Sequence, residues 1–321
     1  MKPTRQSSKI IPWIANNSAL VAMIFLFLIG SIYVKNFLTM QNFSGIFYQY
    51  AIIGFLALGQ LLVILTAGID LSQGSLVAFT SIVVALLMQK FGIGIAVTGG
   101  LLAATALGLV NGWMVSRTRI PPFVVTLGML GIARGLGLVL SNAKPISIEV
   151  ESFNNFGRSA ILGIPVSAIL LVVISLLLAF FLKYRKSGRY IYAIGSSEES
   201  SRLSGIDVKK IKLFVYAASA FLTSIGAVMW TARLNSGSPI GANGYEMESI
   251  AAVIVGGGNL FGGVGTVGGT LIGILLFGMI NSVLNLVGIS PYWQGTIKGV
   301  LILLAVALSQ IQRLRRNKGE A

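Results

Sequence analysis

Residues 183–212 read KYRKSGRYIYAIGSSEESSRLSGIDVKKIK, the longest hydrophilic stretch of a chain that otherwise consists of apolar runs long enough to cross a membrane. The stretch holds eight of the 24 basic residues and three of the nine acidic residues of the chain. Short loops rich in Lys and Arg remain on the cytoplasmic side of a membrane, because moving them across it is unfavourable. We therefore expect residues 183–212 to form a cytosolic loop that a partner protein can reach.

The composition is that of a membrane protein. Of the 321 residues, 55% are hydrophobic and 10% are charged, against about 25% charged in soluble domains, and the mean hydropathy is +0.86. This predicts an all-α, polytopic protein that forms a single transmembrane domain over residues 1–321. The net charge of +15 does not indicate nucleic-acid binding, because the basic residues cluster at the ends of apolar runs, where the membrane lipid surface favours them. Cys and His are absent, which excludes disulfides, thiolate metal sites and a histidine proton carrier.

Ten apolar windows are long enough to cross a hydrocarbon core of about 30 Å. They cover residues 18–34, 51–68, 72–90, 93–115, 121–140, 164–182, 213–232, 245–258, 266–286 and 292–310. With the N-terminus inside, 17 basic residues fall on the cytosolic side and five outside, the asymmetry expected for that orientation. Residues 1–17 then form a cytosolic segment and residues 311–321 a cytosolic basic tail. Arg134 and Lys298 fall within or near spans, where a long side chain can reach toward an interface or line a route.

A short motif occurs twice. The pattern G-x-[D/N]-L-x-x-G is found at residues 68–74 and again at residues 257–263, at an offset of 189 and each time between two apolar runs. Duplicated halves with discontinuous or re-entrant helices are common in transporters, and their sites lie at the interface of the halves. The motif therefore indicates a pseudo-repeat, with chance similarity between Gly-rich segments as the alternative.

Asp70 is the only acidic residue among the first 148 and lies between two windows. A carboxylate at membrane depth costs about 2.5–3.5 kcal/mol at a helix centre on insertion scales, so such a residue is a functional candidate. The alternative is that Asp70, with Gln73 three residues later, caps the helix that begins there. A cap that shapes a discontinuous helix can still serve transport.

Uncharged polar residues on or between the spans are the other candidates for a translocation pathway. Amides and hydroxyls can hydrogen-bond to a passing polyol, although they also join helices. Besides Asp70, these candidates are Gln60, Ser72, Asn111, Asn259, Asn281 and Asn285. No catalytic triad or metal-ligand cluster can be assembled, and the glycine-rich segment 256–265 lacks the Lys-Ser or Lys-Thr ending of a phosphate-binding loop. We therefore expect no enzyme activity, no cofactor in this chain and a motor supplied by another subunit.

Several segments resemble a known family. SGRYIYAIG at residues 187–195 and RLSGI at residues 202–206 are similar to the cytoplasmic coupling loop of the monosaccharide ABC importer permeases of the ribose permease type. TAGIDLSQGS at residues 66–75 resembles the junction between the second and third helices of that family. Further similarity lies at residues 250–253, in the glycine cluster, and at residues 269–273 and 281–286, so the resemblance covers residues 20–310 or so.

The resemblance implies a permease that works as a pair in the bacterial cytoplasmic membrane. An ATP-binding subunit that holds ATP and Mg would drive it from the cytosol, and an extracytoplasmic sugar-binding protein would supply the substrate. In such permeases the loop equivalent to residues 188–207 seats a short helix in a cleft of the ATP-binding subunit. The resemblance assigns this role to Gly188, Arg189, Gly195, Glu198, Arg202, Leu203, Gly205 and Asp207. Glu198 and Glu199 at the start of the short helix and Arg202 near its end suit the helix dipole.

The sequence departs from the family pattern at a few positions. Ser197 stands where Asn is common, residues 199–200 replace a usual Ala pair, residues 258–259 replace a frequent Thr-Ser, and Val264 stands where a basic residue is frequent. The sugar and the matching ATP-binding subunit therefore stay open. Related permeases carry nucleosides, autoinducers or branched-chain amino acids, and an ion-coupled secondary transporter that uses Asp70 is a further alternative.

Overall fold

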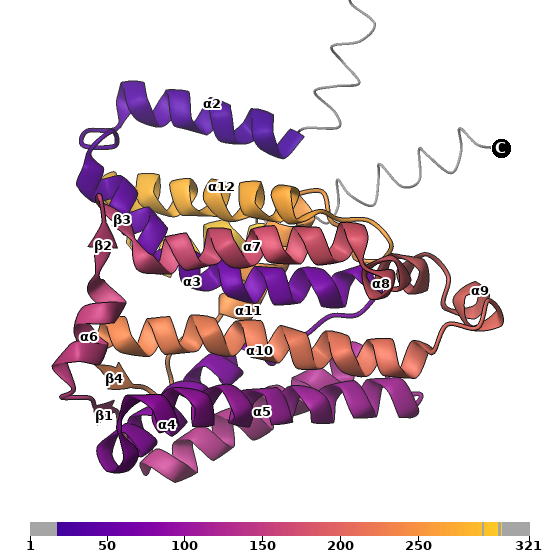
Figure 1. Ribbon diagram of the computed structural model, residues 1–321. Helices are drawn as coiled ribbons and strands as arrows, with labels where there is room; N and C mark the ends of the chain where they lie inside the picture. Colours follow the sequence, from indigo (N-terminus) through magenta and orange to yellow (C-terminus); the bar gives the residue numbers. More distant parts are fainter. Residues whose placement is uncertain (1–17, 291, 301–302, 304–321) are drawn as a thin grey trace, which may run out of the picture.

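The structure is a computed structural model that describes residues 18–290, 292–300 and 303. Figure 1 shows a bundle of long helices that lie side by side, with short helices at its two ends and short strands at one of them. The helices are α2 (Ser18–Tyr33), α3 (Met40–Leu65), α4 (Gln73–Arg117), α5 (Pro122–Ser141), α6 (Glu151–Arg158), α7 (Val166–Tyr184), α8 (Lys186–Ser196), α9 (Glu198–Leu203), α10 (Val208–Leu234), α11 (Tyr245–Val255) and α12 (Val267–Leu286). Residues 292–300 are also helical.

Four two-residue strands complete the described chain: β1 (Ile146–Ser147), β2 (Ala160–Ile161), β3 (Ile164–Pro165) and β4 (Ser236–Gly237). β1 pairs antiparallel with β4, with Ile146 opposite Gly237, and β2 pairs antiparallel with β3. Both pairs lie at the end of the bundle that carries α6, which we call the α6 end (Figure 1). α8 and α9 project from the opposite end, which we call the α9 end.

Six helices in the described part of the chain are long and apolar enough to cross a membrane: α3, α4, α5, α7, α10 and α12. The prediction of a polytopic helical protein is confirmed, whereas the count of ten spans is not. Residues 19–33 form an apolar helix that is shorter than these six. The window at residues 245–258 corresponds to α11, whose 11 residues are too few to cross a bilayer that needs about 20. Residues 301–302 and 304–310 of the tenth window lie outside the described residues.

The windows at residues 72–90 and 93–115 correspond to the two helical limbs of α4, on either side of Gly92. A straight helix of its 45 residues would be about 68 Å long, more than twice the hydrocarbon thickness of about 30 Å. The backbone bends at Gly92, where φ is 77° and ψ is 179°. Glycine is needed there because L side chains rarely adopt this positive φ. The bend turns the second limb of α4 back along the first, so residues far apart in α4 come together.

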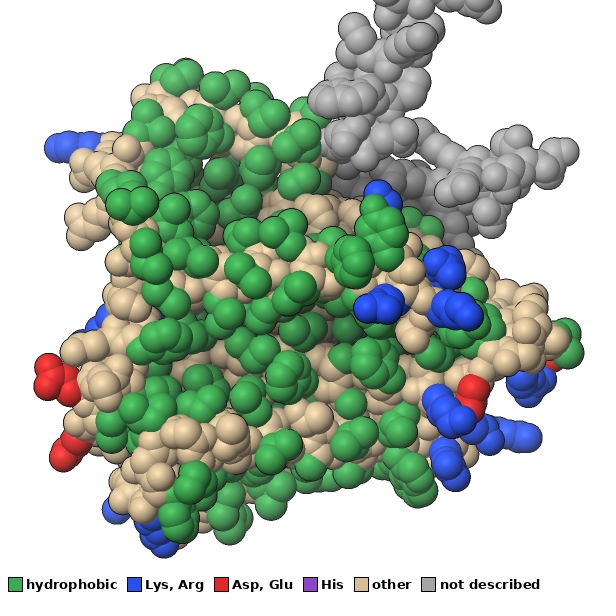
Figure 2. Space-filling model, viewed as in Figure 1, with side chains coloured by type: hydrophobic (Ala, Val, Ile, Leu, Met, Phe, Trp, Pro, Cys, Tyr) green, Lys and Arg blue, Asp and Glu red, His purple; other side chains and the backbone are tan. Residues whose placement is uncertain are grey.

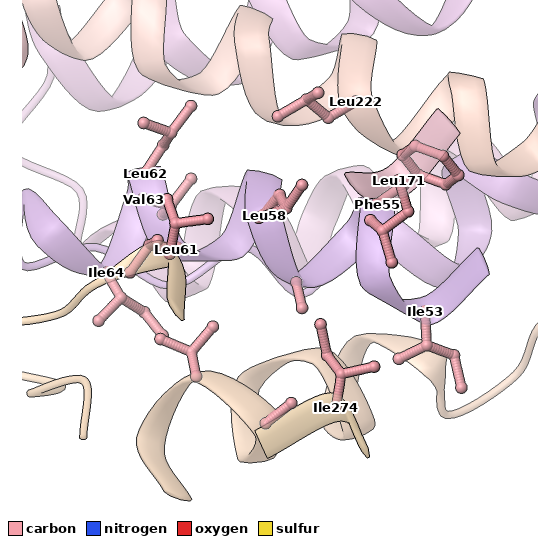
Figure 3. Close-up of a cluster of buried hydrophobic side chains, with 14 of the residues drawn as sticks. Ile53, Phe55, Leu58, Leu61, Leu62, Val63, Ile64, Leu171, Leu222 and Ile274 are labelled. Carbon is pink, nitrogen blue, oxygen red and sulfur yellow. The ribbon is translucent and has the colours of Figure 1, made fainter. Parts of the chain in front are cut away.

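α3 is the central helix of the bundle. Every residue from Tyr50 to Leu65 is buried, and a helix that is apolar all round belongs in a protein interior. Figure 3 shows its side chains, including Phe55 and Leu58, packed with Leu171 of α7, Leu222 of α10 and Ile274 of α12. These contacts fix α7, α10 and α12 around α3.

α10 approaches α3 very closely. A Cβ on Gly59 would lie 2.9 Å from the carbonyl oxygen of Ser219, so glycine is required for this approach. As a result, polar residues of α10 lie beside polar residues of α3 in the protein interior.

Hydrophobic and charged side chains occupy different parts of the surface, as expected for a membrane protein. Figure 2 shows hydrophobic side chains over the middle of the visible face, whereas Lys and Arg gather mainly around α8 and α9. Exposed apolar residues on the long helices include Phe123, Leu127, Leu176 and Phe221. Large exposed apolar area of this kind is suited to contact with lipid or other spans.

Candidate functional site

The chain between α3 and α4 turns back along α3 instead of leaving the bundle. Ala67 has a φ of 59°, and the next residues run beside the end of α3. With its amide oriented to satisfy both groups, Gln60 donates to the carbonyl oxygen of Asp70 (3.1 Å) and accepts from its backbone nitrogen (3.2 Å). Gln73 donates to the carbonyl oxygen of Leu56 at 2.9 Å. Because Leu56 lies nine residues before the end of α3, α4 begins about 14 Å inside the bundle.

Asp70 is buried, with 1% of its surface exposed, and its carboxylate is met by three hydrogen-bond donors. The backbone nitrogen and hydroxyl of Ser72 donate to Oδ1 at 3.0 and 2.6 Å. The hydroxyl of Ser219 on α10 donates to Oδ2 at 3.2 Å. Both oxygens of the buried carboxylate therefore have hydrogen-bond partners.

The capping prediction for Asp70 is right in one respect and wrong in another. An Asp70 oxygen does accept a backbone N–H near the start of α4. However, the N-cap residue is Ser72, and the accepted N–H belongs to Ser72 itself and not to the first turn of the helix. The side chain of Gln73 reaches α3 and α10 and does not turn back to the cap.

The bend of α4 brings a second predicted residue to Ser72. Asn111 on the second limb donates to the Ser72 hydroxyl at 3.2 Å, across 39 positions of sequence. Gln60, Asp70, Ser72 and Asn111 are therefore brought together in one buried cluster, which we call the polar junction. Thr126 of α5 joins it by donating to the carbonyl oxygen of Ile69 at 3.1 Å.

α11 begins at the polar junction, and sequence reasoning missed its contribution. The hydroxyl of Ser249 donates to Oε1 of Gln73 at 2.7 Å, while Nε2 of Gln73 donates to the hydroxyl of Ser219 at 3.2 Å. A Cβ on Gly74 would overlap the carboxylate of Glu246, so the first turns of α4 and α11 touch. The sequence signal for this contact was the pair of acidic residues at the start of the apolar window 245–258.

The two cations that fall near spans have partners inside the protein. Arg134 of α5 donates to the carbonyl oxygens of Pro239 and Gly241 at 3.0 and 2.8 Å, which holds the segment that leads into α11. Lys298 pairs with Glu248 of α11 at 2.6 Å, with side chains that are 17% and 12% exposed. Neither cation therefore reaches out to an interface, and both position α11.

Asn259 lies in a second loop, between α11 and α12, that repeats the local structure around Asp70. α3 ends with a hydrogen bond from the backbone nitrogen of Gly68 to Val63 (3.0 Å), and α11 ends with the same bond from Gly258 to Val253 (2.8 Å). Asn259 Oδ1 then accepts the N–H two residues later at 3.1 Å, as Asp70 does. The two segments therefore share two local hydrogen bonds, although the helix-end bonds are 190 residues apart and the bonds to Asp70 and Asn259 are 189 apart.

The two loops of the repeat contact each other. The backbone nitrogen of Gly263 donates to the carbonyl oxygen of Leu65 at the end of α3, at 3.1 Å. Asn259 itself is not part of the polar junction. Asn281 and Asn285 also lie elsewhere, near the α6 end of α12, in a pocket shared with α3.

α8 packs on both loops of the repeat. Its buried face contains Gly188, Ile191, Ile194 and Gly195, while Arg189 is exposed. A Cβ on Gly195 would overlap the carbonyl oxygen of Leu65 and the backbone nitrogen of Gly263. The hydroxyl of Tyr192 also donates to the carbonyl oxygen of Gly265 at 2.9 Å.

α9 is a short, exposed helix at the tip of the α9 end. Ser197 caps it by accepting from the backbone nitrogen of Ser200 at 3.2 Å. Glu199 pairs with Arg202 at 2.6 Å, and Glu198 pairs with Lys212 of α10 at 2.6 Å. Hydrogen bonding to Glu199 raises the pKa of Arg202 above its usual range.

The end of α9 and the start of α10 form a tight reversal. Gly205 has a φ of 82° and donates to the carbonyl oxygen of Arg202 at 3.0 Å. Leu203 is 79% exposed at this tip. Asp207 caps α10 by accepting from the backbone nitrogen of Lys210 at 3.1 Å, which lowers the pKa of that carboxyl below its usual value. Gly205 follows α9 closely, whereas Gly195 lies inside α8 and serves packing.

Comparison with known proteins matches most of the chain to one family. Residues 42–306 match the family described as "Branched-chain amino acid transport system / permease component". No solved structure matches the chain.

Three relatives align with nearly the whole chain. The ribose import permease protein of Escherichia coli (strain K12) is 40% identical, covering 92% of this chain and 93% of its own length. That of Bacillus subtilis (strain 168) is 38% identical, covering 90% and 91%. The D-allose transport system permease protein of Escherichia coli (strain K12) is 37% identical, covering 93% and 92%. The chain therefore belongs to this family of transport-system permease components.

Proposed function

We propose that this chain is the membrane-spanning permease subunit of an ATP-driven importer that carries a monosaccharide, a pentose or hexose, across the bacterial inner membrane. The observation that carries the proposal is the connection from the exposed helix α9 through α8 to the polar junction. The relatives named for ribose, D-allose and L-arabinose support a sugar as the substrate. The chain is a permease and not an enzyme.

The chemistry of the polar junction supports a neutral, hydroxyl-rich substrate. Most of its side chains are amides and hydroxyls, which both donate and accept hydrogen bonds as sugar hydroxyls do. Its carboxylate, Asp70, already accepts hydrogen bonds from Ser72 and Ser219. Helices that begin inside a membrane protein, as α4 and α11 do here, are a common arrangement at transporter sites.

Residues 183–212 are the segment that couples transport to ATP hydrolysis in this proposal. The ATP-binding subunit holds ATP and Mg and receives α9, with Leu203 and the charges of Glu198, Arg202 and Asp207 at the contact. Arg189 on the exposed face of α8 adds to the same surface. α8 then passes movement to the loops at residues 66–72 and 256–266, because Gly188 and Gly195 leave no space between α8 and its neighbours.

The topology follows from charge and from the two ends of the bundle. We infer ten crossings with both termini in the cytosol, with residues 1–17 and 311–321 as cytosolic segments of a single domain. This count takes α4 as two limbs and takes α11, together with the segment that leads from β4 into it, as one crossing. The basic residues around α8 and α9 support a cytosolic α9 end. The α6 end then faces outward and receives the sugar-binding protein.

A second copy of the permease completes the transporter, and α5 supports this pairing. Gly128, Gly131 and Gly135 lie along α5, and a Cβ on any of them would meet nothing within 4 Å. Small residues at such spacing allow close helix packing in membranes. The pair is therefore inferred to form along α5.

Reconstitution in lipid vesicles tests the proposal. The permease is combined with its ATP-binding subunit and its sugar-binding protein, and uptake of labelled D-ribose, D-allose, L-arabinose and leucine is measured with and without ATP. We expect ATP-dependent uptake of one of the sugars and none of leucine. Uptake of leucine alone would overturn the choice of sugar. Uptake driven by a proton or sodium gradient without ATP would instead favour the ion-coupled alternative.

A further inference from the structure

The α6 end of the bundle holds a second polar site, separate from the polar junction. It is a pocket of about 230 Å³ between the first turns of α3 and the last turns of α12. At about 30 Å³ for each water molecule, it has room for roughly seven waters, the scale of one small polyol and not of an oligosaccharide.

The pocket wall is rich in amides. Its polar side chains include those of Gln41, Gln49, Asn281 and Asn285, and each amide offers donors and an acceptor. Arg233 supplies the one charged side chain among the described residues that line the pocket, and its guanidinium lies over the ring of Tyr48 at 5.3 Å. A wall of this kind matches the hydroxyls of a neutral sugar better than a charged ligand.

Asn281 gives an independent reason to place a ligand here. Its side chain is 4% exposed, and Oδ1 has no hydrogen-bond partner among the residues that the structure describes. Its neighbours are satisfied, because Asn285 accepts from Gln294 at 2.8 Å and Ser282 donates to Asn42 at 2.7 Å. A buried acceptor without a partner is costly unless a ligand or water completes it.

The pocket also adjoins the helix that begins at the polar junction. Tyr50 lines its inner part and lies close enough to Glu248 of α11 to interact with it electrostatically. The next residue, Ser249, hydrogen-bonds to Gln73 in the junction. A molecule bound in the pocket is therefore separated from the polar junction by one helix, α11.

We propose that this pocket binds one neutral monosaccharide before it enters the translocation path, with the side-chain amides of Asn281 and Gln49 hydrogen-bonding to the sugar hydroxyls. The proposal rests on the proposed function and names where that substrate first binds. A Cβ added to Gly45 on the pocket wall would meet no atom within 4 Å, so a larger side chain there would fill the pocket without removing a polar group.

The test uses the full-length permease in lipid nanodiscs, without the ATP-binding subunit or the binding protein. Binding of D-ribose, D-allose and L-arabinose is measured by saturation-transfer NMR and by titration. We expect millimolar or tighter binding of one sugar and a weakening of about tenfold for Asn281→Leu and Gly45→Leu, the size of one lost hydrogen bond or a blocked site. Gln49→Leu provides a second polar variant. Gln89→Leu and Gly94→Leu, at the surface of α4 and away from the pocket, are matched controls.

Thermal unfolding of each variant checks its folding, and Gly45→Leu and Gln49→Leu carry the test if Asn281→Leu does not fold. Normal binding by the pocket variants, or equal weakening by the controls, would overturn the pocket assignment. Absence of binding to the wild-type permease would also overturn it. In each case ATP-driven sugar uptake by the complete transporter would still stand, so the failure of this site and the failure of the proposed function are distinguishable.

Discussion

The hydroxyl of Ser249 on α11 donates a 2.7 Å hydrogen bond to the side-chain oxygen of Gln73 at the start of α4. The two residues are 176 positions apart and belong to α4 and α11, which adjoin the two occurrences of the repeated sequence motif. The bond therefore joins α4 and α11 close to the place where both helices begin. A movement of α11 would therefore act directly on Gln73, at the polar junction.

The first prediction concerns this bond. Gln73→Leu removes three hydrogen bonds and leaves the hydroxyl of Ser249 without its Gln73 acceptor, so we expect a loss of about 1–3 kcal/mol in the free energy of unfolding. Ser249→Ala removes one bond between helices, for which about 0.6 kcal/mol is typical in membrane proteins. Unfolding of the purified permease in mixed micelles, followed by Trp fluorescence, measures both changes.

Ser224→Ala is the matched control, because the buried hydroxyl of Ser224 bonds only within its own helix, to the carbonyl oxygen of Phe221. The double variant Gln73→Leu with Ser249→Ala should cost less than the sum of the two single variants. Full additivity would mean that the two side chains do not interact.

The second prediction concerns the charge of Asp70. Asp70→Asn keeps an oxygen that can accept from the backbone and hydroxyl of Ser72, so we expect substantial sugar uptake. Asp70→Leu leaves the donors of Ser72 and Ser219 buried without an acceptor, and we expect a large loss of folded protein and of uptake. Uptake is measured in cells and normalised to membrane abundance. If Asp70→Asn abolished uptake at normal abundance, a role for the charge and the ion-coupled alternative would gain support.

The positions of the helices could be predicted from the sequence, because a long apolar run is a local signal. The polar residues of the junction also stand out singly within such runs. Their grouping could not be predicted, because it depends on the bend at Gly92 and on the return of the chain along α3. Asn111 and Asn281 are both asparagines within apolar runs. Nevertheless, Asn111 lies in the polar junction and Asn281 lies at the α6 end. Nothing in the sequence distinguishes Ser219 and Ser249 from the other serines on the spans.

The third prediction concerns orientation. The chain has no Cys, so single cysteines can be introduced without a background. Ser152→Cys on α6 and Ser200→Cys on α9 are both exposed positions. In intact cells or spheroplasts, a membrane-impermeant thiol reagent should label Ser152→Cys, whereas Ser200→Cys should react only after the membrane is opened. The reverse pattern would contradict a cytosolic α9 end.

The last prediction tests the coupling role of α9 through the backbone alone. Gly205 has a φ of 82°, and a Cβ added there would meet no atom within 4 Å, so only the conformation of the backbone penalises a substitution. The left-handed region costs an ordinary L-residue about 1–2 kcal/mol, whereas Asn adopts it more readily because its side chain can hydrogen-bond locally. Gly205→Val should therefore shift the reversal after α9 and displace Leu203 and Arg202. Gly205→Asn should keep them in place and serves as the matched control.

We expect Gly205→Val to insert and fold normally, because the reversal lies outside the packed bundle, but to reduce both sugar uptake and substrate-stimulated ATP hydrolysis by the reconstituted complex. A penalty of about 1–2 kcal/mol corresponds to a shift of about 5–30-fold between loop conformations. Gly205→Asn should retain most of both activities. If residues 183–212 were only a solvated basic loop that fixes orientation, both variants would transport and hydrolyse ATP normally, and that result would falsify the docking assignment.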